Sequence, residues 1–109
     1  MGGQAEYEFI EVAPIEDLPV GERLFLELDD QTVVVFNIGG RLCAIADLCT
    51  HDNGPLGEGE LDGDQIICPR HGARFDACSG KALTLPAVTP TKAYPVRVED
   101  GMISIGIEK

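Results

Sequence analysis

The segment CTHDNGPLGEGELDGDQIICPRHG, residues 49–72, begins with one cysteine–histidine pair and ends with another. The pairs are Cys49-x-His51 and Cys68-x-x-His71, separated by sixteen residues, and they contain both histidines of the chain. A lone buried cysteine or a lone hydrogen-bonded histidine is common. A chain in which every histidine lies beside a cysteine at metal-ligand spacing is uncommon. We therefore interpret these four side chains as metal ligands carried by two loops.

Two kinds of metal site could use such ligands. A single zinc ion accepts two cysteines and two histidines, but familiar zinc modules pair cysteine with cysteine and histidine with histidine. Here each loop offers one of each. A two-iron cluster can use this order, because each loop can send its thiolate to one iron and its imidazole to the other. The residues alone therefore leave two interpretations, a [2Fe-2S] cluster and, from a different class, a structural zinc module.

On either side of this segment the sequence has the pattern of short β-strands. The closing hairpin turns at Gly101, and we expect Val96, Val98 and the isoleucines opposite them to face inward. No stretch has apolar residues at helical spacing for three turns. Between Asp47 and Pro90 strands are hard to place, which is typical of a functional segment. We predict an all-β domain with strands at 7–13, 22–28, 32–38, 41–46, 65–69, 94–100 and 102–108.

Length and charge limit the remaining possibilities. A chain of 109 residues predicts one domain, 1–109, with no room for a second core. The net charge of −11 argues against nucleic acid and anionic lipid, and it favours a partner with a basic docking patch. No apolar run approaches the roughly 18 residues of a membrane span. Residues 1–12 lack the features of a secretory signal, so we expect a cytoplasmic protein.

At CTH and CPRHG the sequence resembles the Rieske family, whose motif is Cys-x-His followed, after a spacer of this length, by Cys-x-x-His. Pro69 and Gly72 match residues that commonly follow the second cysteine and the second histidine. The resemblance continues through RFDACSGKAL (74–83), the proline loop (86–90) and the terminal hairpin. It therefore covers essentially the whole chain.

The resemblance implies a fold and a ligand arrangement. The Rieske fold has stacked antiparallel sheets and a small, loop-rich cluster-binding subdomain, here at about residues 46–85. Cys49 and Cys68 would bind the inner iron, and His51 and His71 would bind the outer, solvent-facing iron. The proline loop would cover the cluster.

Four positions indicate which kind of Rieske protein this is. Respiratory and photosynthetic members carry a further cysteine in each loop, joined as a disulfide, where this chain has Gly54 and Arg70. Family members also place a serine and a tyrosine that donate hydrogen bonds to cluster sulfur, where this chain has Ala73 and Phe75. Neither of these side chains can donate. We therefore expect a low-potential ferredoxin.

The expected function is one-electron transfer and not catalysis. A flavoprotein reductase would reduce the protein, which would pass the electron to a Rieske non-haem iron oxygenase that hydroxylates an aromatic ring. The alternatives within electron transfer are a small redox subunit of another reductase, such as nitrite reductase, and a ferredoxin for iron–sulfur assembly. The acidic rim, which we define as Glu58, Glu60, Asp62 and Asp64, is a candidate docking surface, and Asp47 and Asp52 could influence the histidines.

Cys43 and Cys78 are the two cysteines outside the motif. Cys43 lies in an apolar strand, where a buried, small side chain is expected. Cys78 lies in a turn after the second loop, where a structural role is expected. A disulfide between them would be unexpected in a reducing cytoplasm.

Overall fold

The computed structural model describes residues 6–28 and 30–108. Within them, ten strands and the short 3₁₀ helix η1 (Ile15–Asp17) follow one another. The strands are β1 (Tyr7–Pro14), β2 (Arg23–Leu28), β3 (Gln31–Ile38), β4 (Arg41–Ala46), β5 (Leu61–Asp62), β6 (Gln65–Ile67), β7 (Arg74–Asp76), β8 (Ala93–Tyr94), β9 (Val96–Glu99) and β10 (Met102–Glu108). No helix in these ranges is long and apolar enough to cross a membrane. Residues 1–5, the start of the stretch assessed for a secretory signal, lie outside them.

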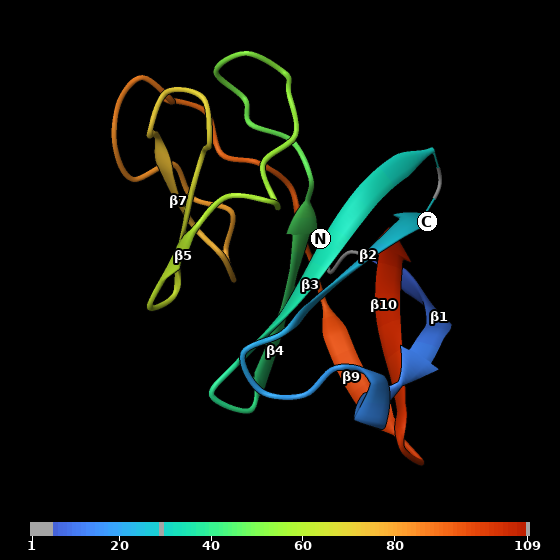
Figure 1. Ribbon diagram of the computed structural model, residues 1–109. Coiled ribbons are helices and arrows are strands. Elements are labelled where there is room, and N and C mark those ends of the chain that lie inside the picture. The colour runs from blue at the N-terminus through green and yellow to red at the C-terminus, as the bar shows by residue number, and fades with distance from the viewer. Residues whose placement is uncertain (1–5, 29, 109) are drawn as a thin grey trace.

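The strands form three antiparallel sheets. The first has the order β1-β10-β9, the second β2-β3-β4-β8 and the third β5-β6-β7. In Figure 1 the first two sheets make up one half of the molecule, and the small third sheet with its loops makes up the other. The prediction of an all-β chain of stacked antiparallel sheets is confirmed.

The second sheet lies in the middle, and apolar cores cover both of its faces. Val33 and Val35 of β3 pack in one core with Ile103 and Ile105 of the first sheet. The β3 side chains that point to the opposite face of the sheet pack in the other core, together with both motif cysteines and with Phe75 of the third sheet. A strand that is buried on both faces has no solvent-exposed face, so its sequence does not alternate between apolar and polar residues. This explains the uninterrupted apolar run in β3.

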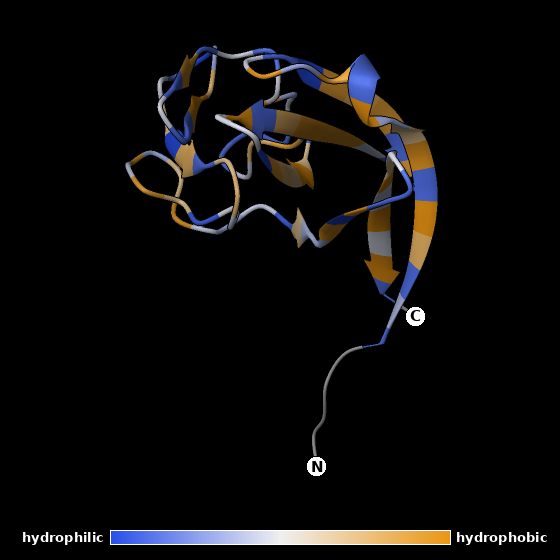
Figure 2. Cartoon of the chain, turned by 90° about the horizontal axis from the view of Figure 1, so that it is seen from below, coloured by the Kyte–Doolittle hydropathy of each residue, from blue (hydrophilic) through white to orange (hydrophobic). Residues whose placement is uncertain are grey.

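Strands with strong patterns lie where the sequence predicts them. Leu24 and the other leucines of β2 pack towards the core, while Phe25 on the opposite face is partly exposed. Figure 2 shows the strand nearest the N-terminus banded by hydrophobic and hydrophilic residues, whereas the strand that ends at the C-terminus is mostly hydrophobic. The inward orientation of Val98 was a wrong prediction. Val98 lies near the end of β9, the last strand of its sheet, and is 45% exposed.

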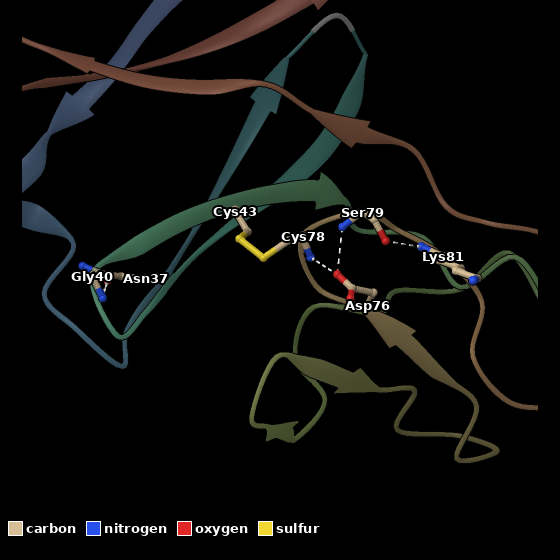
Figure 3. The surroundings of a disulfide bond; sticks show 7 residues. All are labelled: Asn37, Gly40, Cys43, Asp76, Cys78, Ser79 and Lys81. Carbon is tan, nitrogen blue, oxygen red and sulfur yellow. Dashed lines mark hydrogen bonds between the residues drawn. A yellow bond between two sulfur atoms is a disulfide. The ribbon is translucent and has the colours of Figure 1, made fainter.

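Cys43 and Cys78 form a disulfide, which corrects the expectation that they would remain unpaired. Cys43 pairs with Phe36 across the β3–β4 ladder, so its side chain shares the sheet face on which the third sheet packs. The carboxylate of Asp76 accepts hydrogen bonds from the backbone N–H groups of Cys78 and Ser79 and fixes their turn. Figure 3 shows the bond connecting β4 to this turn. The disulfide therefore joins the central sheet to the half of the molecule that carries the motif.

Candidate metal centre

The two motif loops have the same backbone hydrogen-bond pattern. In loop 1 (residues 47–57), the Cys49 N–H donates to the Gly54 carbonyl, and the Asn53 N–H donates back to the Cys49 carbonyl. In loop 2 (residues 68–73), the Cys68 N–H donates to the Ala73 carbonyl, and the Gly72 N–H donates back to the Cys68 carbonyl.

Each loop also has a residue with a left-handed backbone conformation at the same position after its cysteine, with φ of 62° at Asn53 and 75° at Gly72. Asparagine and glycine are the residues that adopt this conformation most readily. The two loops are therefore repeats of one local structure in which a cysteine is the first residue.

Contacts from the central sheet hold loop 1. The Asp47 carboxylate, which directly follows β4, accepts hydrogen bonds from the backbone N–H groups of Leu56 and Gly57. The Arg23 guanidinium of β2 donates to the carbonyls of Gly57 and Gly59. The sequence suggests Asp47 as a group that influences the histidines electrostatically. In the structure its carboxylate instead closes the loop through these hydrogen bonds. Arg23 therefore joins the loop to the central sheet, and Asp47 closes the loop on itself.

The four predicted ligands come together as two pairs. Cys49 and Cys68 have free thiols and are buried, with exposures of 0% and 1%. Their sulfur atoms and a carboxylate oxygen of Asp52 all lie within 4.8 Å of one another. The rings of His51 and His71 are exposed, with centroids 5.0 Å apart and planes at 88°. The thiols therefore lie inside and the imidazoles outside.

Both sulfur atoms receive backbone hydrogen bonds from their own loop. The donors are the second and third residues after the cysteine, His51 and Asp52 for Cys49 and Arg70 and His71 for Cys68. These bonds lower both thiol pKa values against the effect of burial, which raises them. Burial prevails at Cys49, whose pKa is raised.

At Cys68 the backbone bonds, the Cys49 thiol and the charge of Arg70 prevail over burial, and the pKa is lowered. Hydrogen bonds aimed at sulfur favour the deprotonated form that binds metal.

Asp52 and Arg70 form an ion pair beside the thiols, with Nε of Arg70 2.6 Å from Oδ2 of Asp52. The pKa of Asp52 is well below its usual range, first because of the Arg70 hydrogen bond and then because of the Gly54 N–H. The pKa of Arg70 is raised, chiefly by the same bond. Oδ2 of Asp52 also lies 3.7 Å from Nδ1 of His71. No sequence pattern predicts this pair, whose members are eighteen residues apart.

The proline loop (86–90) is anchored to loop 1, because the Thr50 hydroxyl donates to the Thr89 carbonyl. Figure 1 shows loop 1 in green, loop 2 in yellow and the proline-loop segment in orange at the end of the molecule away from β1 and β10. Leu85, just before this loop, and Val88 within it are 76% and 77% exposed. Of the acidic rim, Asp62 pairs with Arg74, and all four side chains are exposed.

The residues present fit a [2Fe-2S] cluster with mixed ligands. Such a cluster needs two thiolates for one iron and two neutral imidazoles for the other. The buried sulfur pair and the exposed imidazole pair supply these two sets separately, and the backbone hydrogen bonds favour thiolates. Thiol and imidazole ligands also suit zinc. The donor set alone therefore leaves both metals open.

Comparison with known proteins resolves this choice. Residues 8–95 match the family described as the Rieske [2Fe-2S] domain. The 3-phenylpropionate/cinnamic acid dioxygenase ferredoxin subunit of Escherichia coli (strain K12) is 42% identical over 99 residues, which cover 90% of this chain and 92% of that protein.

Two solved structures share the fold. The ferredoxin of carbazole 1,9a-dioxygenase from Nocardioides aromaticivorans IC177 has a TM-score of 0.82 and 32% identity, covering 89% of this chain and 95% of that one. A chain in the complex of reduced oxygenase and oxidized ferredoxin in carbazole 1,9a-dioxygenase has a TM-score of 0.84 and 31% identity, covering 93% of this chain and 94% of that one.

Proposed function

The chain belongs to the Rieske [2Fe-2S] domain family and is a ferredoxin-type electron carrier, and on this premise we propose that it supplies the terminal oxygenase of an aromatic-ring dioxygenase system. The observation that carries the proposal is the exposed pair of imidazoles above a buried pair of thiols. An electron carrier needs a redox centre with one edge at the surface and a short-lived interface. Each relative described above is named as a ferredoxin or occurs in a complex that contains one.

We assign the four motif side chains as the cluster ligands, with Cys49 and Cys68 on the inner iron and His51 and His71 on the outer iron. When bound, the cluster supplies a site that accepts and returns one electron. The loops hold the ligands in place, the backbone N–H groups stabilise the thiolates, and the apolar core excludes water from the sulfur atoms. We further propose a single domain, 1–109, whose part at about 46–85 binds the cluster.

The proposed donor is a flavoprotein reductase that oxidises a reduced nicotinamide cofactor. The proposed acceptor is a Rieske non-haem iron oxygenase, and the proposed compartment is the cytoplasm, where the Cys43–Cys78 disulfide would be unusual. Stopped-flow absorbance with the reductase and the oxygenase of one such system tests the electron route. We expect bleaching of the visible bands on mixing with the reduced reductase and their recovery on adding the oxygenase. Reduction without recovery would favour a nitrite reductase-like or assembly role instead.

We expect electron transfer from the reductase to slow as salt is added, because the chain carries a net charge of −11. Association steered by charge weakens as the Debye length shrinks from about 30 Å to about 8 Å, between about 0.01 and 0.15 M salt. The measurement is the second-order rate constant across that range. A constant that does not depend on salt would show that docking is apolar.

Matched variants identify the surface responsible. The double variant Glu58→Gln/Glu60→Gln neutralises part of the acidic rim and should reduce the salt dependence. Glu8→Gln/Glu11→Gln removes the same charge from β1, on the sheet farthest from the loops, and should leave the dependence unchanged. Leu85→Ser should slow transfer equally at all salt concentrations, because it removes an exposed apolar contact.

A further inference from the structure

Arg70 connects the two ligand loops through three hydrogen bonds. Its Nε and one terminal nitrogen donate to the two carboxylate oxygens of Asp52, at 2.6 and 2.9 Å. The other terminal nitrogen donates to the Pro55 carbonyl at 2.7 Å. All three acceptors belong to loop 1, whereas Arg70 belongs to loop 2. A planar guanidinium is suited to this task because it presents its donors in a rigid fork.

Loop 1 is shaped to receive this side chain. The Gly54 N–H donates to Oδ1 of Asp52 at 3.0 Å, and this hydrogen bond helps to orient the carboxylate towards Arg70. A Cβ at Gly54 would lie 2.7 Å from the guanidinium carbon of Arg70, so the absence of a side chain there makes room for the contact. The pair lies at the surface, with the Arg70 and Asp52 side chains 33% and 24% exposed.

The same side chain brings a positive charge to the sulfur pair. Arg70 interacts electrostatically with Cys68 and Cys49 as well as with Asp52. Arg74, the other arginine of this half of the molecule, pairs instead with Asp62 of β5 at 2.9 Å and does not connect the ligand loops. Within the described residues, Arg70 is therefore placed to affect both the geometry and the charge of the centre.

We propose that Arg70 is a positioning residue of the metal centre, which fastens loop 1 to loop 2 through Asp52 and Pro55 and holds a positive charge beside the two cysteine sulfurs. The proposal rests on the proposed function only in that the centre binds a [2Fe-2S] cluster. It predicts two separate effects, on the retention of the cluster and on its reduction potential.

The experiment uses the holoprotein and four variants, Arg70→Met, Arg70→Lys, Asp52→Asn and Arg74→Met. Cluster loss is followed as the decay of visible absorbance at a fixed concentration of chelator, and the potential is measured by protein-film voltammetry. We expect Arg70→Met to lose its cluster several-fold faster and to have a lower potential. Arg70→Lys keeps the charge without the fork, so only its cluster loss should accelerate.

Asp52→Asn supplies the decisive comparison. It should also accelerate cluster loss, but its potential should rise, because a negative charge has been removed. Both variants should accelerate cluster loss, but they should move the potential in opposite directions. General disruption of the loops cannot explain that result. The proposal is overturned if both move the potential the same way, or if Arg70→Met behaves like Arg74→Met. A protein that contains no iron would instead refute the proposed function.

Discussion

Removal of the Cys43–Cys78 disulfide should lower the free energy of unfolding by about 4 kcal/mol, the value expected from chain entropy for a loop of this length. The bond joins residues 35 apart in sequence and connects the central sheet to the half that carries the ligand loops. For a chain of 109 residues this corresponds to a fall in Tm of about 15 °C. The measurement is thermal unfolding by circular dichroism of wild type and of Cys43→Ala/Cys78→Ala.

A thiol reductant provides the control. Reductant should lower the Tm of the wild type towards that of the double variant and leave the double variant unchanged. Thiol counting in the unfolded, unreduced apoprotein should find only Cys49 and Cys68, since these are the free cysteines. Four thiols in the freshly purified protein, with equal Tm values for the two proteins, would show that the bond does not form.

The second large effect concerns the reduction potential. The wild-type midpoint should lie near the low end of the Rieske range of roughly −150 to +300 mV. Ala73 and Phe75 are fully buried and pack in the same core as Cys49 and Cys68, and neither side chain can donate a hydrogen bond to sulfur. Without such donors the added electron is less well stabilised.

Ala73→Ser and Phe75→Tyr should each raise the midpoint where the new hydroxyl reaches a sulfur. A hydrogen bond to a charged group contributes about 1.5–3 kcal/mol, which is about 60–130 mV for a one-electron couple. Ala77→Ser is the matched control, because Ala77 is equally buried in the same core but is not a position of the family's donors. Voltammetry measures the midpoint potentials of the wild type and the three variants. We expect Ala73→Ser and Phe75→Tyr to lie above both the wild type and Ala77→Ser. A wild-type midpoint well above zero would refute the low-potential assignment and remove support for the oxygenase partner.

The parts of the fold with strong hydrophobic patterns could be predicted from the sequence. The run in β3 and the alternation in β2 depend on which faces are buried, and burial is recorded directly in residue type. The strands β5 and β7 have only two or three residues each, and they were missed. The predicted strand 94–100 merged the end of β8 with β9. Two or three residues are too few to show a periodic pattern, and β8 moreover pairs with the distant strand β4.

The site divides in the same way. The four proposed ligands stand out in the sequence because histidine and cysteine are rare here and their spacing is specific, and the structure brings them together as a thiol pair and an imidazole pair. The contacts that hold them in place could not be predicted. The Asp52–Arg70 pair and the Cys43–Cys78 disulfide join residues that are adjacent only after folding. Asp47 is an example. From the sequence, an aspartate beside a metal motif could act on the ligands electrostatically or accept hydrogen bonds from the backbone. The fold shows that it accepts hydrogen bonds from the backbone N–H groups of Leu56 and Gly57.

The most direct test of the central claim is the iron and acid-labile sulfide content of the purified protein. Cys49, His51, Cys68 and His71 are proposed to hold one [2Fe-2S] cluster, so we predict a red-brown protein with two irons and two sulfides per chain that takes up one electron on reduction. A colourless protein with a single zinc per chain, unchanged by anaerobic incubation with iron and sulfide, would contradict the assignment and identify a structural zinc module.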